Sequence, residues 1–343
     1  MKQSILNFPL DILQNLMIEN DFKKFNASQI FGWIYKKNIT DFEKMSNISI
    51  KLKEFLSENY SILTTELIEK TQSVDKTIKF ILETREKFRI ESVIIFDKER
   101  ITLCVSSQIG CPLNCKFCRT GNHGFERNLS TGEIIEQIIW SSKLGFIPSN
   151  IVFMGMGEPL LNFDNLLSSL YILFEPAGFN YSPRKVTIST SGICDKILEL
   201  DKKIPYLSYA VSLHSADNSK RTSIMPVNKK YNLEELGHTL RKIKLKPRQH
   251  LTIEYIIIPG LNNSEKDALL LVKYLKNIKC KINLIAFNPF ENSSWRKPSN
   301  EEVDFFRNIL KKHGLLVNFR ISKGQDIKAA CGQLAFKTSK QPD

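Results

Sequence analysis

Residues 101–118 read ITLCVSSQIGCPLNCKFC, and this stretch decides the fold. Its first six residues alternate in the manner of a β-strand, and a loop with three cysteines follows. Cys111, Cys115 and Cys118 have the spacing C-x3-C-x2-C, with no fourth cysteine beside them. A structural zinc site takes four ligands, and ferredoxin-type clusters take four cysteines. Three ligands favour a [4Fe–4S] cluster with one iron open to a small molecule; zinc with a remote ligand such as His123, or unligated core cysteines, are the alternatives.

Beyond this stretch, short β-rich runs alternate with amphipathic helical segments. The runs cover 101–106, 150–155, 185–190, 207–213, 251–258, 282–287 and 316–321, and the helical segments include Glu133–Leu144, Leu233–Ile243, Glu265–Asn277 and Glu301–His313. Such alternation predicts an α/β fold with a parallel sheet and right-handed crossovers. Six or seven units in about 240 residues favour a partial βα (TIM-like) barrel. The chemically unusual residues follow the strands, where the loops of such a barrel open on one face.

Residues 1–100 have a different pattern. Apolar residues at three- and four-residue spacing predict helices over Asp11–Met17, Ala27–Tyr35 and Ile50–Leu56. Residues 70–96 alternate as an antiparallel hairpin. We therefore expect a small helical accessory domain over 1–70, a β-hairpin linker over 71–100 and a catalytic barrel over 101–343.

The chain is basic, with 49 Lys and Arg against 36 Asp and Glu in 343 residues. Residues 101–343 hold 33 of the basic and 21 of the acidic side chains, so the excess lies in the larger part. A basic excess indicates an acidic partner, most often nucleic acid. The acid-free stretch 241–248, taken alone, is more simply a solvated face.

Composition also excludes several classes of protein. A hydrophobic content of 42% and an aromatic content of 10% exclude a disordered chain. No run approaches the roughly 20 apolar residues of a membrane helix, and the first residues do not resemble a secretory signal. We expect a cytoplasmic protein with no membrane partner, in which the seven cysteines form no structural disulfides.

A C-x3-C-x2-C loop after the first strand of a βα barrel resembles the signature of radical S-adenosylmethionine (SAM) enzymes. In that superfamily the open iron binds the amino and carboxylate groups of SAM, and reduction by one electron gives a 5′-deoxyadenosyl radical. The resemblance implies that the residues contacting SAM are Gly157, Glu158, Ser189, Ser212, Leu213, His214 and Asn288. From the residues alone, a histidine at a strand end is more often a buried core residue.

Longer motifs are similar to one family within the superfamily, the RlmN family of RNA adenine-C2 methyltransferases. They are CVSSQIGC at 104–111, RNLS at 127–130, FMGMGEPLLN at 153–162, STSG at 189–192, MPVNKKY at 225–231 and DIKAACGQL at 326–334. The family implies two substrates, an adenosine of 23S rRNA at the peptidyl transferase centre and the adenosine 3′ to the anticodon of tRNA. It also implies an electron donor such as flavodoxin or ferredoxin. We expect a monomer, with Lys23-Lys24 and Lys36-Lys37 as candidate RNA contacts.

The resemblance implies three catalytic residues. Cys331 takes a methyl group from one SAM molecule, and the radical from a second converts that group into the carbon radical that adds to adenine. Cys104 then resolves the adduct and leaves a transient disulfide, while Glu91 accepts a proton. From the residues alone, Cys104 would be a small buried hydrophobe and Glu91 a solvent-facing strand residue. Cys194 and Cys280 are assigned to packing.

Two other functions stay open at this point. A sister family methylates C8 of the same ribosomal adenine, confers antibiotic resistance and shares the cluster and both catalytic cysteines. The GEPL stretch at 157–160 and MPVNKKY favour C2. A non-catalytic RNA-binding protein with a metal site would also explain the cysteine loop and the basic charge, but Cys331 and the cofactor loops argue against it.

Overall fold

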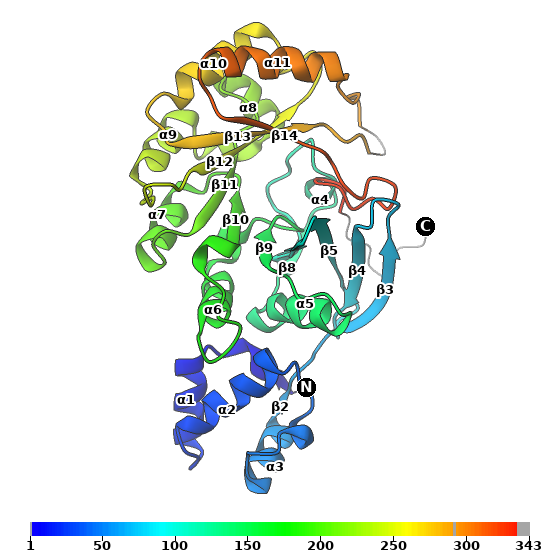
Figure 1. The fold of residues 1–343 in the computed structure, drawn as a ribbon, viewed down its shortest axis with the longest axis vertical. Coiled ribbons are helices and arrows are strands. Elements are labelled where there is room, and N and C mark those ends of the chain that lie inside the picture. The colour runs from blue at the N-terminus through cyan, green and yellow to red at the C-terminus, as the bar shows by residue number, and fades with distance from the viewer. Residues whose placement is uncertain (1, 291–292, 335–343) are drawn as a thin grey trace.

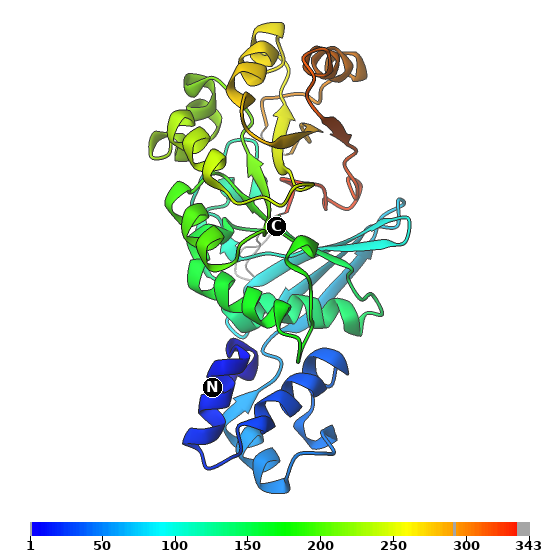
Figure 2. The ribbon, with the colours of Figure 1, turned by 60° about the vertical axis from the view of Figure 1, so that its left-hand side comes forward.

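The computed structural model describes residues 2–290 and 293–334. A small helical region, blue in Figure 1, lies at one end of a larger α/β region, and Figure 2 shows the same arrangement from a second direction. The helical region contains α1 (Leu10–Glu19), α2 (Phe25–Phe31), α3 (Ile50–Asn59) and the short parallel pair β1 (Gln3–Ser4) and β2 (Tyr60–Ser61). The predicted N-terminal helical domain is confirmed in type, because all three helices form at the expected apolar repeats.

Glu136 fastens the helical region to the rest of the chain. This buried carboxylate on the first barrel helix accepts hydrogen bonds from the backbone N–H and the hydroxyl of both Thr64 and Thr65, at 2.5–2.9 Å. Nearby, the backbone N–H of Gly132 donates to Asn7 Oδ1 at 2.7 Å. Burial raises the pKa of Glu136 to about 7, while the hydrogen bonds from the two threonines act in the opposite direction.

The main sheet of the described residues has ten strands in the order β14-β13-β12-β11-β10-β9-β6-β5-β4-β3. Its parallel strands are β6 (Arg100–Cys104), β9 (Asn150–Phe153), β10 (Val186–Thr190), β11 (Ser208–Ser212), β12 (Leu251–Ile257), β13 (Cys280–Ala286) and β14 (Val317–Arg320). Each of these strands coincides with one of the predicted β-rich runs. The predicted α/β fold with a partial βα barrel is therefore confirmed.

Helices cover the outer face of these strands (Figure 1). They are α5 (Thr131–Lys143), α6 (Phe163–Phe174), α7 (Cys194–Lys203), α8 (Asn218–Ile224), α9 (Leu233–Lys242), α10 (Glu265–Leu275) and α11 (Asn300–Lys312). The helices α5, α10 and α11 begin at capping boxes, in which Ser130, Ser264 and Ser299 exchange hydrogen bonds with the acid three residues later. Local sequence thus sets where these crossover helices start.

Three antiparallel strands continue the sheet beyond β6. They are β5 (Arg89–Asp97), β4 (Ile78–Glu83) and β3 (Glu66–Gln72). Val93 of β5 is opposite Cys104 of β6, so the expected hairpin is paired directly into the barrel sheet. The domain limits at residues 70 and 100 stay predictions.

The turn between β3 and β4 holds the C-terminal segment that carries Cys331. Asp326 accepts hydrogen bonds from the Ser73 hydroxyl at 2.5 Å and from the Val74 N–H at 3.1 Å. The Gly324 N–H donates to Asp75 Oδ2 at 2.8 Å. These bonds span the gap between the two edge strands, β14 and β3, which are not paired with each other.

The basic stretch 241–248 joins α9 to β12, and its Lys and Arg side chains are exposed. A loop that precedes a parallel strand lies at the amino edge of the sheet, whereas the cysteine loop follows β6 at the carboxyl edge. The stretch is therefore remote from the cysteine loop, which agrees with a solvated face. Among the described residues, no helix combines the length and the apolar character needed to cross a bilayer.

Candidate active site

A cavity of about 540 Å³ opens among the strands and the loops at their carboxyl ends. Five cysteines from three separate segments line it, namely Cys104, Cys111, Cys115, Cys118 and Cys331. It is also lined by the expected cofactor contacts Gly157, Glu158, Ser189, Ser212 and His214. The structure thus brings together residues that are up to about 230 positions apart in the sequence.

The cysteine loop is held by backbone contacts. It lies between β7 (Gln108–Gly110) and β8 (Phe125–Asn128), and the Cys111 N–H donates to Gly124 O at 2.7 Å. Asn114 has a φ of +51°, a left-handed conformation that asparagine adopts more readily than most residues. The loop also contacts the barrel, because the Lys116 N–H donates to Ile224 O at 3.0 Å.

Neighbouring groups in the cysteine loop affect the pKa values of Cys111 and Cys115. Burial raises the pKa of Cys111 to about 12 and that of Cys115 well above its ordinary value, and Cys118 and Glu158 act in the same direction on both. Cysteine binds metals as the thiolate, and a positively charged metal centre favours that form. Within residues 2–290 and 293–334, no three His, Cys, Asp or Glu side chains are arranged so that they could hold one metal ion. Three soft donors that face one cavity are the set that an iron–sulfur cluster with an open iron takes.

The Gly155–Glu158 loop packs closely on the end of β6. A Cβ on Gly155 would lie 2.5 Å from Ser106 Oγ, and one on Gly157, where φ is +97°, would lie 2.5 Å from Gln108 Cβ. The Glu158 N–H donates to Gln108 Oε1 at 2.8 Å, and its carboxylate accepts from the Ser191 N–H at 2.7 Å. Glu158 therefore joins the loops after β6, β9 and β10, and its burial raises its pKa.

His214 is a neutral, hydrogen-bonded residue. Its Nδ1 accepts from the Ile256 N–H at 3.0 Å, and its ring meets Phe117 of the cysteine loop edge to face at 4.6 Å. Burial lowers the His214 pKa to about 3, and the charge of Arg221 adds to the effect. The side chain is thus a satisfied histidine that also lines the cavity. Leu213 beside it is fully buried and does not line the cavity.

Cys104 and Cys331 lie in the same cavity and interact. Cys104 is 8% exposed, and burial together with the nearby Cys331 thiol raises its pKa to about 12. Cys331 has an exposed surface, but burial of its thiol in the cavity raises its pKa as well. Asn288 supports the Cys331 segment, because its Nδ2 donates to Cys331 O at 3.4 Å and to Ser322 Oγ at 3.1 Å. Asn288 does not line the cavity.

Glu91 lies on β5 and is buried rather than solvent-facing. It forms an ion pair with Lys79 at 3.5 Å, and both side chains are shielded from solvent. Its side chain is on the same face of β5 as Val93, which lines the cavity opposite Cys104. Glu91 itself is not among the lining residues, so it stands beside the cavity.

Three charged residues of this region were not predicted from the sequence. Arg221 is fully buried and donates to backbone oxygens of Ser191, Ser212 and Leu213. Glu254 and Arg320 line the cavity from β12 and β14. A charged residue inside an apolar strand, as in LTIEYIII at 251–258, is the signal that could have identified Glu254.

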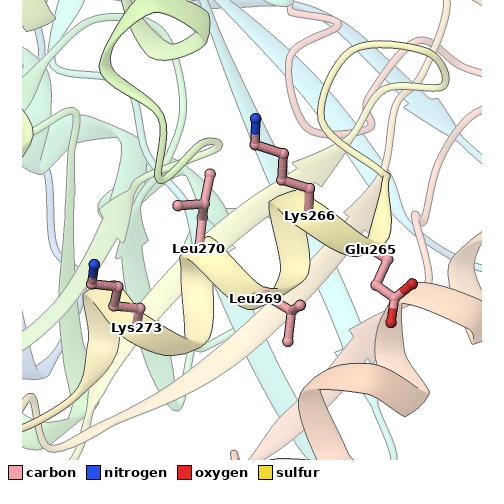
Figure 3. Close-up of a pocket in the computed structure, with 5 residues that line it drawn as sticks. All are labelled: Glu265, Lys266, Leu269, Leu270 and Lys273. Carbon is pink, nitrogen blue, oxygen red and sulfur yellow. The ribbon is translucent and has the colours of Figure 1, made fainter.

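A second depression lies on the outer surface of α10 and is lined by Glu265, Lys266, Leu269, Leu270 and Lys273. Figure 3 shows Lys266, Leu270 and Lys273 on one side of the helix and Glu265 and Leu269 on the other. All five come from one helix, and none is a predicted site residue. We assign no function to this surface.

Comparison with known proteins agrees with these features. Residues 105–272 match the Radical SAM superfamily, and residues 3–62 match the ribosomal RNA large subunit methyltransferase N-terminal domain. The dual-specificity RNA methyltransferase RlmN of Buchnera aphidicola subsp. Cinara cedri is 44% identical over 346 residues, covering 97% of this chain and 96% of the relative. The protein of the same description from Campylobacter hominis is 39% identical over 356 residues, covering 99% and 98%.

One solved structure is similar over almost the full length. The crystal structure of a radical SAM methyltransferase from Sphaerobacter thermophilus has a TM-score of 0.92 at 33% identity. The match covers 98% of this chain and 100% of that chain, so the helical region is included along with the barrel.

Proposed function

The chain belongs to the RlmN family of radical SAM RNA methyltransferases, and from this membership we propose that its cavity methylates C2 of adenosine in 23S rRNA and tRNA. The observation that carries the proposal is the convergence of Cys104, Cys331 and the three cysteines of the loop in one cavity. A binding module would need the loop cysteines alone. Two further thiols in the same cavity support group transfer through sulfur.

Cys111, Cys115 and Cys118 would hold a [4Fe–4S] cluster, and the loops at Gly157–Glu158, Ser189 and Ser212–His214 would contact SAM. When bound, this pair supplies a 5′-deoxyadenosyl radical, which is needed because the electrophilic C2 of adenine does not attack a methyl sulfonium. Gly155 and Gly157 let the backbone approach closely where a Cβ would collide. Asn288 would contact SAM. Because it also donates to Cys331 O, it would position the Cys331 segment as well.

Cys331 would be the methyl carrier. Its thiolate would attack the methyl carbon of one SAM molecule and take the methyl group, with S-adenosylhomocysteine as the leaving group, as an accessible nucleophilic sulfur does. The S-methyl group on Cys331 would then need the radical for its activation, so two SAM molecules would be used per turnover. The exposed surface of Cys331 at the cavity supports a role that needs contact first with SAM and then with a base.

Cys104 would resolve the adduct, and Glu91 would accept the proton. Attack by Cys104 on the Cys331 sulfur frees the base and leaves a disulfide that a cytoplasmic reductant can reverse. Glu91 is buried and lies 3.5 Å from the Lys79 ammonium, a partner that suits a carboxylate at this position. Because Glu91 stands beside the cavity, this assignment requires the substrate to approach β5.

RNA would reach the cavity with its target base flipped out of the stack. Phosphate contacts supply most of the affinity for structured RNA, and the basic excess of the barrel suits such contacts. The N-terminal helical region, with Lys23-Lys24 and Lys36-Lys37, would be the accessory RNA-binding part. The enzyme would act in the cytoplasm as a monomer and receive electrons from a flavodoxin or ferredoxin.

The test is nucleoside mass spectrometry of rRNA and tRNA after anaerobic incubation with reconstituted enzyme, SAM and a reductant. We expect 2-methyladenosine with the wild-type chain and none with Cys331→Ala. Formation of 8-methyladenosine would overturn the position of methylation and assign the sister activity. If neither product forms while the cluster is intact and SAM is cleaved, the RNA substrate assignment is wrong.

A further inference from the structure

Arg320 reaches from the last strand of the barrel to Met154, which follows the parallel neighbour of the strand that carries Cys104. It ends β14 and lines the same cavity as both catalytic cysteines. Its Nη1 lies 3.5 Å from Met154 Sδ, and Met154 follows β9, the parallel neighbour of β6. The backbone N–H of Met154 is in turn hydrogen-bonded to the Cys104 thiol. The guanidinium is thus held beside Cys104 through Met154.

The charge of the Arg320 guanidinium is not neutralised by a direct ion pair in the described residues. Its electrostatic partners include Glu254, Cys331 and Cys104. Glu254 Oε1 accepts a hydrogen bond from Asn283 Nδ2 at 3.0 Å. Its Oε2 is buried with no hydrogen-bond partner in the described residues. Within the same residues no carboxylate lies within ion-pair distance of Arg320. Arg320 is therefore balanced at longer range by Glu254, and its charge acts on the two sulfurs in the same cavity.

The other cations around the cavity are engaged elsewhere or do not act on Cys104. Arg100 pairs with Asp97 at 2.6 Å, Lys323 donates to Phe96 O, and Lys281 is exposed at the amino end of β13. The remaining titratable groups that line the cavity are Cys111, Cys115, Cys118, Glu158, His214, Glu254 and Cys331. In the described part of the chain, Arg320 is the cation that acts on Cys104.

Cys104 needs such a cation. A thiol attacks a sulfur as the thiolate, yet burial and the neighbouring Cys331 both oppose ionisation of Cys104. Arg320 and the Met154 N–H are the two features that favour the charged form. We propose that Arg320 is a positioning residue that stabilises the Cys104 thiolate while it attacks the Cys331 sulfur, an inference that rests on the proposed function.

In this step the Cys104 sulfur supplies an electron pair to the Cys331 sulfur, and an S–S bond forms. The bond between the Cys331 sulfur and the transferred carbon breaks, and that carbon keeps the electron pair and takes up a proton to become the methyl group. The two sulfurs are oxidised by two electrons and the carbon is reduced by two. A dithiol reductant returns both cysteines to thiols before the next turnover.

The first test measures Cys104 directly and needs neither RNA nor cofactor. Full-length chain in a Cys331→Ser background is alkylated with iodoacetamide across a pH series, and the Cys104 peptide is followed by mass spectrometry. Arg320→Met should raise the apparent pKa of Cys104 and slow its alkylation about tenfold or more near neutral pH. Arg320→Lys should restore most of the rate, and Lys281→Met should leave it unchanged. The proposal is overturned if Arg320→Met leaves the Cys104 profile unchanged.

Alkylation of Cys194 and Cys280 in the same samples shows whether a variant has opened its fold.

A second test uses complete reaction mixtures. Arg320→Met with both cysteines present should accumulate a covalent protein–RNA adduct on Cys331, as Cys104→Ala should. If Cys104→Ala forms no adduct, the proposed function fails, whereas an adduct with Cys104→Ala and none with Arg320→Met overturns the role of Arg320.

Discussion

The guanidinium of Arg221 donates a 2.7 Å hydrogen bond to Asn228 Oδ1, and both side chains are buried. Arg221 lies on α8, and Asn228 belongs to the MPVNKKY motif that follows it. The remaining donors of Arg221 bind backbone oxygens at the ends of β10 and β11, beside Ser189 and Ser212. This pair therefore fixes the loops proposed to contact SAM without lining the cavity itself.

Replacing Asn228 should loosen this arrangement. Asn228→Ala leaves a buried guanidinium donor without its acceptor, so we expect the free energy of unfolding to fall by about 1–3 kcal/mol and SAM binding to weaken. Urea unfolding and calorimetric titration of SAM measure the two effects. Lys229→Ala, an exposed neighbour, is the control and should change stability by less than about 0.5 kcal/mol. Equal stability of the two variants would contradict the prediction.

Cys115 should be required for the cluster and not for the fold. In Cys115→Ala the iron content after anaerobic reconstitution should fall to about a tenth or less of wild type, with loss of the visible iron–sulfur absorbance. Cys194→Ala, which removes a buried thiol on α7 outside the cavity, should keep both. Circular dichroism of the metal-free chains should be the same for all three. A Cys115→Ala protein that retains its iron would refute the assigned ligand set.

Gly157→Ala separates steric collision from backbone strain. The added Cβ would meet Gln108 Cβ at 2.5 Å, while Gly145→Ala has a similar φ of +90° with open space around it. We expect a loss of about 1 kcal/mol for Gly145→Ala and about 2–4 kcal/mol for Gly157→Ala. Displaced Gln108 would also release the Glu158 backbone, so SAM affinity should fall in Gly157→Ala alone. Equal losses of stability in the two variants would rule out the close approach.

His214 should contribute to acid sensitivity. Its pKa is about 3 in the folded chain and about 6.5 when unfolded, so only the unfolded state takes up the proton between those values. The free energy of unfolding should therefore fall by up to about 1.4 kcal/mol per pH unit below pH 6.5. His214→Asn, which suits the φ of +58°, should show a shallower decline between pH 6.5 and 5.5. His238→Asn, at an exposed position on α9, should match the wild-type slope.

The sequence predicted the repeating part of the fold because that part depends on local signals. Apolar runs gave all seven parallel strands, and serine–acid pairs such as Ser130 and Glu133 begin the helices between them. The position of the cysteine loop after β6 then followed from chain order. Contacts between loops were less accessible, since nothing local in the sequence shows that Asp326 binds Ser73 across the gap between β14 and β3.

The unpredicted residues are charged side chains in buried positions. Arg221 was missed because arginine is usually exposed, and five hydrogen bonds to neutral oxygens are visible only once the chain is folded. Glu91 was identified through the resemblance, but from its residue type alone it would face solvent, whereas it is buried beside Lys79. Arg320 closes a strand that reads LVNFRI, where one polar position in two is ordinary.

The gap between β14 and β3 gives the barrel a seam that is joined by side chains and turns instead of a strand ladder. A cylinder sealed along its whole length would have to break backbone pairing before a nucleotide entered from the side. Here the hydrogen bonds of Asp75 and Asp326 connect the two edges. Residues 322–334 can therefore separate from the β3–β4 turn while the backbone pairing between strands stays intact. Amide hydrogen exchange should accordingly be fastest along this segment and slow in β12 and β13.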